Sequence, residues 1–388
     1  MSALPLAATP YMGWNTYYGV GGVFDEQTIM SVADAVVDRG LARAGYRIMW
    51  LDYGWASGAR DSASELIVDP GQWPRGLRWL TDQLHARGLL AGIYTDAGPS
   101  GCDGQGVGSL GHYQQDADRF ASWGFDAVKI DFGGGGQQRL DPEVCCREFV
   151  RALRGNSSRR PMVINVCNFW RPGQVGDGYP PLERSAYATH RWASQIAQSW
   201  RTDTDVGFTR DVVFANVLRN LDTNARHPEA AGPGHWNDPD YIVPELGLSS
   251  VEARAQFTMW ATVSAPLVIG ADVRAISNQA VAMLSNPEVI AVDQDPLGMQ
   301  GTPIKRDQAG DVWLKPLVGE DRAIAMLNRG LTPTRVTANA TEIGLTPDSV
   351  FQVRDLWTHT STHTAGTISA EVPAHGADLY RISPAAAS

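Results

Sequence analysis

The sequence predicts an α/β fold, a (β/α)8 TIM barrel followed by a C-terminal antiparallel β-sandwich domain. Two observations carry this prediction. Up to residue 298, short apolar runs that end in polar residues alternate with helical patterns, which is typical of a parallel sheet. Beyond that point the segments are short, β-rich and separated by Gly, Pro, Asp and Thr, without a helical period. We therefore expect a barrel domain in residues 1–298 and a β domain in residues 299–388.

The barrel strands are predicted where an apolar run stops at a polar residue. A parallel strand is buried on both faces, so it appears in the sequence as a nearly continuous apolar run. In such barrels the chemistry lies at the carboxyl ends of the strands, where these polar residues fall. The runs are 46–51 before Asp52, 89–94 before Asp96, 125–130 before Asp131 and 162–167 before Asn168, and further strands are expected near Ser199, His235 and Leu267.

Helices are predicted between these strands. Residues 27–40 and 77–88 each place apolar side chains at helical spacing and end at a glycine. The run Gly133–Gly136 is expected to be a flexible loop at the rim. The alternative fold is a doubly wound open sheet, but no Gly-x-Gly-x-x-Gly fingerprint follows the first strand to support it.

The C-terminal region is expected to be a structural cover for part of the barrel, with a separate sugar-binding module as the alternative. Its candidate strands lie in the segments 311–317, 322–327, 350–353 and 377–382.

Composition limits the possible partners. A net charge of -10 argues against nucleic acid, because phosphate binding needs clustered Lys and Arg. No apolar run approaches the ~20 residues of a membrane span, and the first residues do not form a signal peptide. We expect a soluble, cytoplasmic protein, or a secreted one if a signal was removed. The four cysteines do not form a disulfide framework, so reduced thiols are expected.

Lys129 and Asp131 are the first functional candidates. Side chains alternate along a strand, so both point toward the same side, while Val128 and Ile130 point to the other. A second carboxylate, Asp205, follows the predicted strand near Ser199. Two carboxylates facing each other across a pocket are the arrangement that cleavage of a glycosidic bond requires. Glycoside hydrolysis is therefore the working hypothesis.

A series of motifs resembles glycoside hydrolase family 27, the α-galactosidases and α-N-acetylgalactosaminidases. The resemblance is ordered and spans nearly the whole chain, and that family has a (β/α)8 barrel with a C-terminal antiparallel β domain. The motifs are Tyr11-Met12-Gly13-Trp14-Asn15, Gly45-Tyr46 through Leu51-Asp52, Lys129-Ile130-Asp131, Ser199-Trp200-Arg201 with Asp205, Trp236-Asn237-Asp238-Pro239-Asp240, and Asn286-Pro287 through Asp293-Gln294-Asp295-Pro296-Leu297-Gly298.

The resemblance implies a retaining double displacement, with Asp131 as nucleophile and Asp205 as acid/base. In this mechanism the two carboxyl groups lie about 5 to 5.5 Å apart. Lys129 beside Asp131 would favour the ionised nucleophile, and burial would help Asp205 to keep its proton. Arg201, four residues before Asp205, would favour ionisation instead, and is expected to hold a sugar hydroxyl or to help Asp205 act as base.

Aromatic and polar residues near these motifs are candidates for sugar binding. Trp14 and Trp200 are the preferred stacking residues, with Tyr94 as a further candidate, because sugar C–H faces pack on aromatic rings. Asp238 contacts substrate or only forms a tight turn.

Two positions depart from the family pattern. The family has two consecutive acids where this chain has Asp52 and Tyr53, and a Glu where it has Asn168. In the family the two adjacent acids together bind the 4- and 6-hydroxyls of galactose, so Tyr53 removes one acceptor and crowds that corner, and the missing Glu usually contacts the 2-hydroxyl. A galactose-like sugar, β-L-arabinopyranose and an isomaltosyl or α-glucosyl group are therefore all open as substrates.

Two other classes of function remain as alternatives. One is a carbohydrate-binding protein without catalysis, and the other is a metal-dependent barrel enzyme of the enolase type with Lys as base. The preferred hypothesis needs no metal and no cofactor, takes a glycoside or an oligosaccharide as its partner, and leaves the oligomeric state open.

Overall fold

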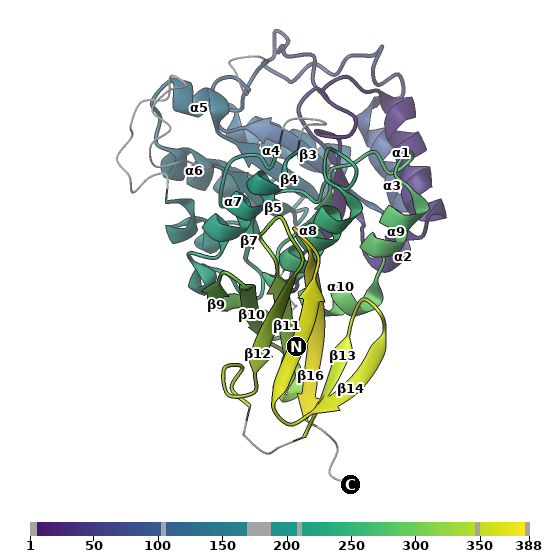
Figure 1. Cartoon of the computed structure of the whole chain (residues 1–388). Helices are drawn as coiled ribbons and strands as arrows, with labels where there is room; N and C mark the ends of the chain where they lie inside the picture. Colours follow the sequence, from purple (N-terminus) through teal and green to yellow (C-terminus); the bar gives the residue numbers. More distant parts are fainter. Residues whose placement is uncertain (1–5, 102–105, 169–187, 208–211, 346–349, 385–388) are drawn as a thin grey trace.

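Eight parallel strands form the N-terminal barrel in the computed structural model, which describes residues 6–101, 106–168, 188–207, 212–345 and 350–384 (Figure 1). The sheet order is β7-β6-β5-β4-β3-β2-β1-β8. A parallel bridge between Ile242, just after β7, and Ile269 of β8 closes the ring. The strands are β1 Met12–Asn15, β2 Ile48–Leu51, β3 Leu90–Asp96, β4 Ala127–Asp131, β5 Val163–Cys167, β6 Ser199–Arg201, β7 Trp236–Asp238 and β8 Leu267–Ile269.

The barrel prediction is confirmed, and the open sheet is wrong. The first strand, β1, pairs with β2 on one side and with the last strand, β8, on the other. A closed barrel requires this pairing of the first and last strands. All seven predicted strands are present. The eighth, β1, contains Gly13 and Asn15 and therefore does not form the apolar run that identified the others.

Helices surround the barrel. Helix α1 begins at an Asp25 cap, and α8 begins at a capping box formed by Ser249 and Glu252. The helices are α1 Glu26–Asp38, α2 Leu41–Ala44, α3 Gly76–Ala86, α4 Tyr113–Trp123, α5 Gly133–Gln137, α6 Pro142–Arg154, α7 Phe214–Asn224, α8 Ser250–Thr262, α9 Asn278–Leu284 and α10 Pro287–Asp293, with 3-10 turns η2 Thr189–Arg191, η3 Ala193–Gln195, η4 Pro228–Ala230 and η5 Val318–Glu320.

The glycine run predicted as a flexible loop is instead the short helix α5. A Cβ on Gly134 would lie 2.0 Å from the carbonyl oxygen of Ser100, and one on Gly98 would lie 2.1 Å from the amide nitrogen of Gly135. The glycines are therefore needed for close backbone packing against the loop after β3. The Gly134 amide also donates to the Asp96 carboxylate at 3.1 Å.

The C-terminal region forms an antiparallel β domain, as predicted, and lies below the barrel in Figure 1. A six-stranded sheet has the order β14-β13-β16-β11-β10-β9, and β12 pairs with β15. The strands are β9 Thr302–Asp307, β10 Gly310–Pro316, β11 Arg322–Leu327, β12 Thr334–Asn339, β13 Phe351–Asp355, β14 Thr360–Thr364, β15 Thr367–Val372 and β16 Ala377–Pro384. The boundary between residues 298 and 299 stays a prediction.

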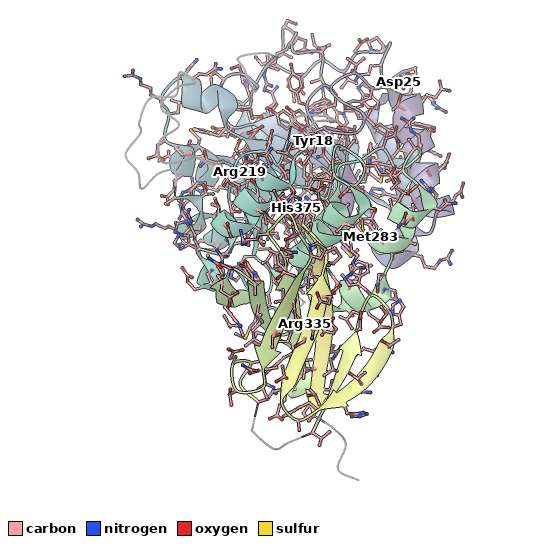
Figure 2. All side chains as sticks on the ribbon, viewed as in Figure 1. Tyr18, Asp25, Arg219, Met283, Arg335 and His375 are labelled. Carbon is pink, nitrogen blue, oxygen red and sulfur yellow. The ribbon has the colours of Figure 1, made fainter. Side chains whose placement is uncertain are left out.

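This domain packs on the outside of the barrel. Trp313 and Leu379 belong to the same buried cluster as the barrel side chains, and the indole of Trp357 donates to Thr258 of α8. Helix α8 is accordingly buried on nearly every side. Figure 2 shows side chains throughout both domains. The contacts of Trp313, Leu379 and Trp357 with the barrel support the structural role expected for the β domain.

Among the described residues, no helix combines the length and the apolar character needed to cross a bilayer.

Candidate active site

Polar side chains form a ring at the carboxyl ends of the barrel strands. The strand register places Asp96 beside Asp131, and Asp131 beside Cys167. Arg201 lies beside Asp238 in the same way. The alternation of inward side chains along neighbouring strands therefore brings these groups to one level of the barrel mouth.

Asp52 and Lys129 form a buried ion pair within this ring. Lys129 Nζ lies 2.7 Å from Asp52 Oδ2, which also accepts a 2.7 Å hydrogen bond from Asn15. The Tyr241 hydroxyl accepts from Lys129 at 3.1 Å and donates to Asp52 at 3.2 Å. Burial is the largest single influence on each group and opposes its charge, but the surrounding partners together outweigh it, so the pKa of Asp52 is lowered and that of Lys129 is raised. The pair therefore stays charged.

Lys129 has a partner that the sequence did not predict, in addition to Asp131. Its ammonium was expected to act on Asp131, its neighbour along the strand. In the structure, Asp52 raises the pKa of Lys129 more than Asp131 does. The reason is that Asp52 follows the second strand and approaches Lys129 across the barrel interior, a contact that the spacing along one strand does not reveal.

Asp131 is the last residue of β4 and is 9% exposed. Its Oδ1 accepts the Phe132 amide at 2.9 Å. The neighbouring Asp96 accepts amides from Gly98 and Gly134 at 2.6 and 3.1 Å. Burial, and then Asp131, raise the pKa of Asp96 to about 7. Below that pH Asp96 is neutral, so it adds no negative charge beside Asp131.

Asp205 lies in the loop after β6, where Arg201 Nη2 donates to its Oδ1 at 3.0 Å. Arg201 is 2% exposed and also pairs with Asp240 at 3.1 Å. Burial raises the pKa of the Cys167 thiol, and Asp131 and Asp205 both raise it further. Cys167 lies beside Asp131 in the strand register, and Arg201, which holds Asp205, lies 3.8 Å from Cys167 Sγ, so Asp131 and Asp205 border the same part of the barrel mouth.

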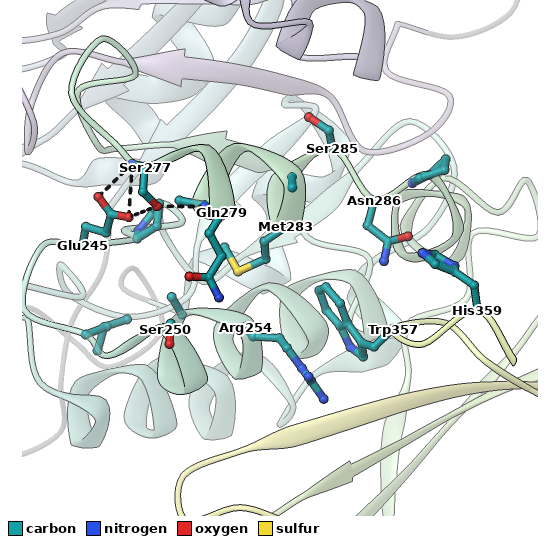
Figure 3. Close-up of a pocket in the computed structure, with 16 residues that line it drawn as sticks. Glu245, Ser250, Arg254, Ser277, Gln279, Met283, Ser285, Asn286, Trp357 and His359 are labelled. Carbon is teal, nitrogen blue, oxygen red and sulfur yellow. Dashed lines mark hydrogen bonds between the residues drawn. The ribbon is translucent and has the colours of Figure 1, made fainter.

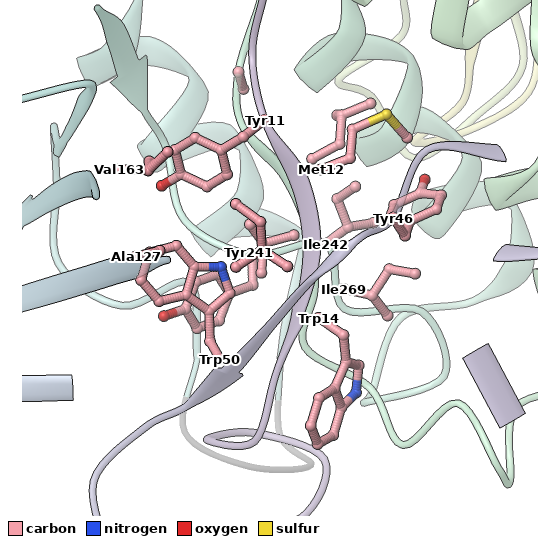
Figure 4. Packing of buried hydrophobic residues seen from close by; sticks show 14 of the residues in the cluster. Tyr11, Met12, Trp14, Tyr46, Trp50, Ala127, Val163, Tyr241, Ile242 and Ile269 are labelled. Carbon is pink, nitrogen blue, oxygen red and sulfur yellow. The ribbon is translucent and has the colours of Figure 1, made fainter. Parts of the chain in front are cut away.

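The predicted stacking roles of Trp14 and Trp200 are wrong. Both residues have no exposed surface. Their strand neighbours Asn15 and Arg201 point into the barrel, so alternation turns the two indoles outward. Trp14 donates to the Ala271 carbonyl at 2.9 Å and lies near Ile269 in the buried packing of Figure 4. Trp200 stacks on His235 at 6.5 Å between centroids.

The aromatic side chains that line the site around Lys129 are tyrosines. The rings of Tyr17 and Tyr94 lie 5.8 and 5.6 Å from its Nζ. Tyr53 packs edge-on against Tyr94 at 6.1 Å and is partly exposed. A phenol therefore lies directly after Asp52, where the family pattern has a carboxylate.

The two remaining predicted sugar contacts are both buried. Asn168 donates to the Thr189 hydroxyl at 2.9 Å and lies at the end of β5. Asp238 accepts from Asn165 at 2.9 Å and from the Asp240 amide at 2.8 Å. Both Asp238 oxygens are therefore engaged within the protein, which favours its turn-forming role over direct contact with substrate.

The structure adds further residues to those predicted for the site, among them Asn15, Tyr18, Asp96, Asp240 and Tyr241. Three of them could have been found from the sequence: Asn15 and Asp240 lie in motifs shared with the family, and Asp96 ends an apolar run. The positions of Tyr18 and Tyr241 depend on long-range packing and could not have been found in this way. The Tyr18 hydroxyl donates to Asp240 at 2.6 Å.

Replacing Lys129 by methionine is expected to destabilise the fold by about 3 kcal/mol, because the buried Asp52 carboxylate loses its counter-charge. The lowered pKa of Asp52 and the raised pKa of Lys129 mean that the pair stabilises the protein between about pH 4 and pH 10. Urea unfolding at pH 7 measures the loss, which should shrink as the pH falls through the pKa of Asp52.

The matched control is the double variant Asp52→Asn/Lys129→Met, which removes both charges and should recover part of the stability. A loss below about 1 kcal/mol in the single variant would show that the pair does not stabilise the fold.

A groove of about 430 Å³ lies outside the barrel, between α8, α9 and the β domain (Figure 3). Its charged side chains already have partners: Glu245 accepts the Ser277 amide at 3.1 Å, and Arg254 pairs with Asp378. His359 pairs with Glu288 at 2.7 Å. This groove therefore does not compete with the barrel mouth as the catalytic site.

The free thiols in the described part are Cys145, Cys146 and Cys167, and Cys102 lies outside it. No three His, Cys, Asp or Glu side chains within the described ranges are arranged to hold a metal ion.

Comparisons with known proteins identify the family. Residues 20–295 match the family model described as alpha galactosidase A, and residues 307–382 match that of the alpha galactosidase C-terminal beta sandwich domain. The rice (Oryza sativa subsp. japonica) α-galactosidase is 37% identical over 383 residues, covering 98% of this chain and 86% of that protein.

Solved structures agree. α-Galactosidase I from Mortierella vinacea superposes with a TM-score of 0.87 at 30% identity and covers 100% of both chains. A β-L-arabinopyranosidase from Geobacillus stearothermophilus has the same fold, with a TM-score of 0.84, 20% identity and 98% of each chain covered. The chain belongs to the α-galactosidase family, glycoside hydrolase family 27, and is an α-galactosidase-like glycoside hydrolase.

Proposed function

We propose that the protein removes terminal α-galactoside-type residues from glycosides or oligosaccharides, with Asp131 as nucleophile and Asp205 as acid/base. The observation that supports this proposal is the geometry around Cys167 at the barrel mouth: Cys167 lies beside Asp131 in the strand register, and Arg201 lies 3.8 Å from Cys167 Sγ and 3.0 Å from Asp205. The proposed mechanism requires the two carboxyl groups to lie about 5 to 5.5 Å apart.

The reaction takes two steps. An Asp131 oxygen bonds to the anomeric carbon while the glycosidic C–O bond breaks, and Asp205 gives its proton to the departing oxygen. Asp205 then takes a proton from water as that water attacks the anomeric carbon and breaks its bond to Asp131. The configuration at the anomeric carbon is inverted twice and is therefore retained.

Other residues would hold the sugar. The Asp52–Lys129 ion pair forms the charged floor of the site, where it can bind the sugar hydroxyl groups. The rings of Tyr17 and Tyr94 flank this floor. Charged groups give stronger hydrogen bonds to hydroxyls than neutral ones do. Asn168 offers both a donor and an acceptor in place of the family Glu.

A second candidate substrate follows from Tyr53. This phenol replaces an acceptor for the 6-hydroxyl and occupies space beside Asp52, so a sugar without C6, such as β-L-arabinopyranose, would avoid the crowding. The reaction would be the same.

A panel of 4-nitrophenyl glycosides tests the function: α-D-galactoside, α-N-acetylgalactosaminide, α-D-glucoside and β-L-arabinopyranoside. We expect turnover of the galactoside or the arabinopyranoside, and NMR should show the retained anomer as the first product. Inactivity on all four, with binding detected by calorimetry, would support the non-catalytic alternative.

The Tyr53→Asp variant serves as the internal comparison in the same panel. Restoring the carboxylate should raise the ratio of kcat/KM for galactoside over arabinopyranoside by about 10- to 100-fold. An unchanged ratio would show that Tyr53 does not select the sugar.

A further inference from the structure

The loop that carries Asp205 is held from two sides. Arg219 of α7, labelled in Figure 2, donates to the Asp205 carbonyl at 2.6 Å. On the other side, the Val206 amide donates to Asp240 Oδ2 at 2.7 Å. The peptide group that follows Asp205 is therefore held at both its carbonyl and its N–H by groups outside the loop.

Asp240 also acts on the Asp205 side chain through Arg201. The Arg201 guanidinium is shared, with one nitrogen 3.0 Å from Asp205 and another 3.1 Å from Asp240. A cation alone beside Asp205 would favour its ionised form, which cannot donate a proton. The Asp240 carboxylate offsets that positive charge.

Asp240 is buried and contacts protein groups through both carboxylate oxygens. It has no exposed surface, its Oδ2 accepts from Tyr18 and Val206, and its Oδ1 faces Arg201. Burial raises the pKa of Asp240 to about 6, although Arg201 opposes the shift. Asp240 is therefore charged above about pH 6 and does not reach the sugar.

From this geometry we infer that Asp240 is a positioning residue for the acid/base: it anchors the backbone at Val206 and compensates the charge of Arg201. The inference rests on the proposed role of Asp205. Other ionisable groups that act on or near Asp205 are Tyr18 after β1, Asp131 on β4 and Cys167 on β5.

The test is Asp240→Asn. Asparagine has the same size and tolerates the φ of 86° at this position. If the amide oxygen accepts from Tyr18 and Val206, the NH2 group faces Arg201. The positive charge of Arg201 is then no longer balanced by a carboxylate at position 240, and it favours the ionised form of Asp205. The basic limb of the kcat/KM profile should move to lower pH by about one unit. On the alkaline side of that limb, kcat/KM for a substrate with a poor leaving group should therefore be about tenfold lower than in the unmodified enzyme.

Asp203→Asn is the matched control, since the Asp203 carboxylate lies in the same loop and accepts from Thr223 at 2.6 Å and from the Thr204 amide at 2.7 Å. It should leave the basic limb in place. If Asp240→Asn does not fold, Tyr18→Phe removes one hydrogen bond from Asp240 and should move the limb in the same direction by less.

The results distinguish the role of Asp240 from the role of Asp205. A basic limb that stays in place in Asp240→Asn and Tyr18→Phe, or an equal loss for good and poor leaving groups, would overturn the role of Asp240. If removal of Asp205 itself leaves turnover of poor leaving groups unchanged, the proposed acid/base is wrong instead.

Discussion

Asp131→Ala is expected to lower kcat by about 10³-fold or more, because the covalent step has no substitute nucleophile. Asp96, the neighbouring carboxyl, is held by amides of Gly98 and Gly134, and burial and Asp131 raise its pKa to about 7. It is therefore not free to move into the place of Asp131, and burial still raises its pKa in the variant, where the effect of Asp131 is absent. Initial rates on the best aryl glycoside of the panel measure the effect.

Chemical rescue makes this result specific. Azide can enter the space left by the carboxylate, form a C–N bond at the anomeric carbon and expel the leaving group, giving a glycosyl azide of inverted configuration. Asp96→Asn is the matched control and should retain activity within about tenfold. Wild-type activity in Asp131→Ala would remove Asp131 as the nucleophile.

The sequence predicted the barrel well because its strands follow a local rule. A strand buried on both faces is a short apolar run, and the run ends where the chain reaches the polar mouth. This rule located Asp131 at the end of β4 and Asn168 just after β5. It failed for β1, whose Gly13 leaves room for the Ile48 carbonyl and whose Asn15 belongs to the site.

The wrong prediction for Trp14 and Trp200 conflicts with the alternation of side chains along a strand. The same period of two that turns Lys129 and Asp131 inward turns Trp14 and Trp200 outward, beside the inward Asn15 and Arg201. The pattern is present in the sequence, and it predicts the outward position of both indoles more reliably than the general tendency of sugars to pack on aromatic rings.

Other features of the site could not be read from sequence because they join distant segments. The Asp52–Lys129 pair spans 77 positions, and the Tyr18–Asp240 hydrogen bond spans 222. Which carboxylate meets which cation depends on how the barrel closes. Composition and periodicity carry no information on that choice, whereas the fold class needs only the order of the strands and helices.

Asp205→Ala is expected to separate substrates by their leaving groups. Loss of the acid should lower kcat/KM about 10²- to 10⁴-fold for a sugar or alkyl leaving group, which needs its oxygen protonated. An activated nitrophenolate departs without a proton and should lose much less. The variant should fold, because Arg201 keeps its 3.1 Å partner in Asp240.

The second step gives an independent check on Asp205. Without the base, hydrolysis of the bond to Asp131 becomes rate-limiting for activated substrates, so the intermediate should accumulate and show a burst of nitrophenolate. Azide needs no base and should speed this step, giving a glycosyl azide of retained configuration. That is the opposite anomer from the one expected with Asp131→Ala, so the two variants assign the two carboxylates to opposite faces of the sugar. Equal losses for good and poor leaving groups, with no burst, would contradict an acid/base role for Asp205.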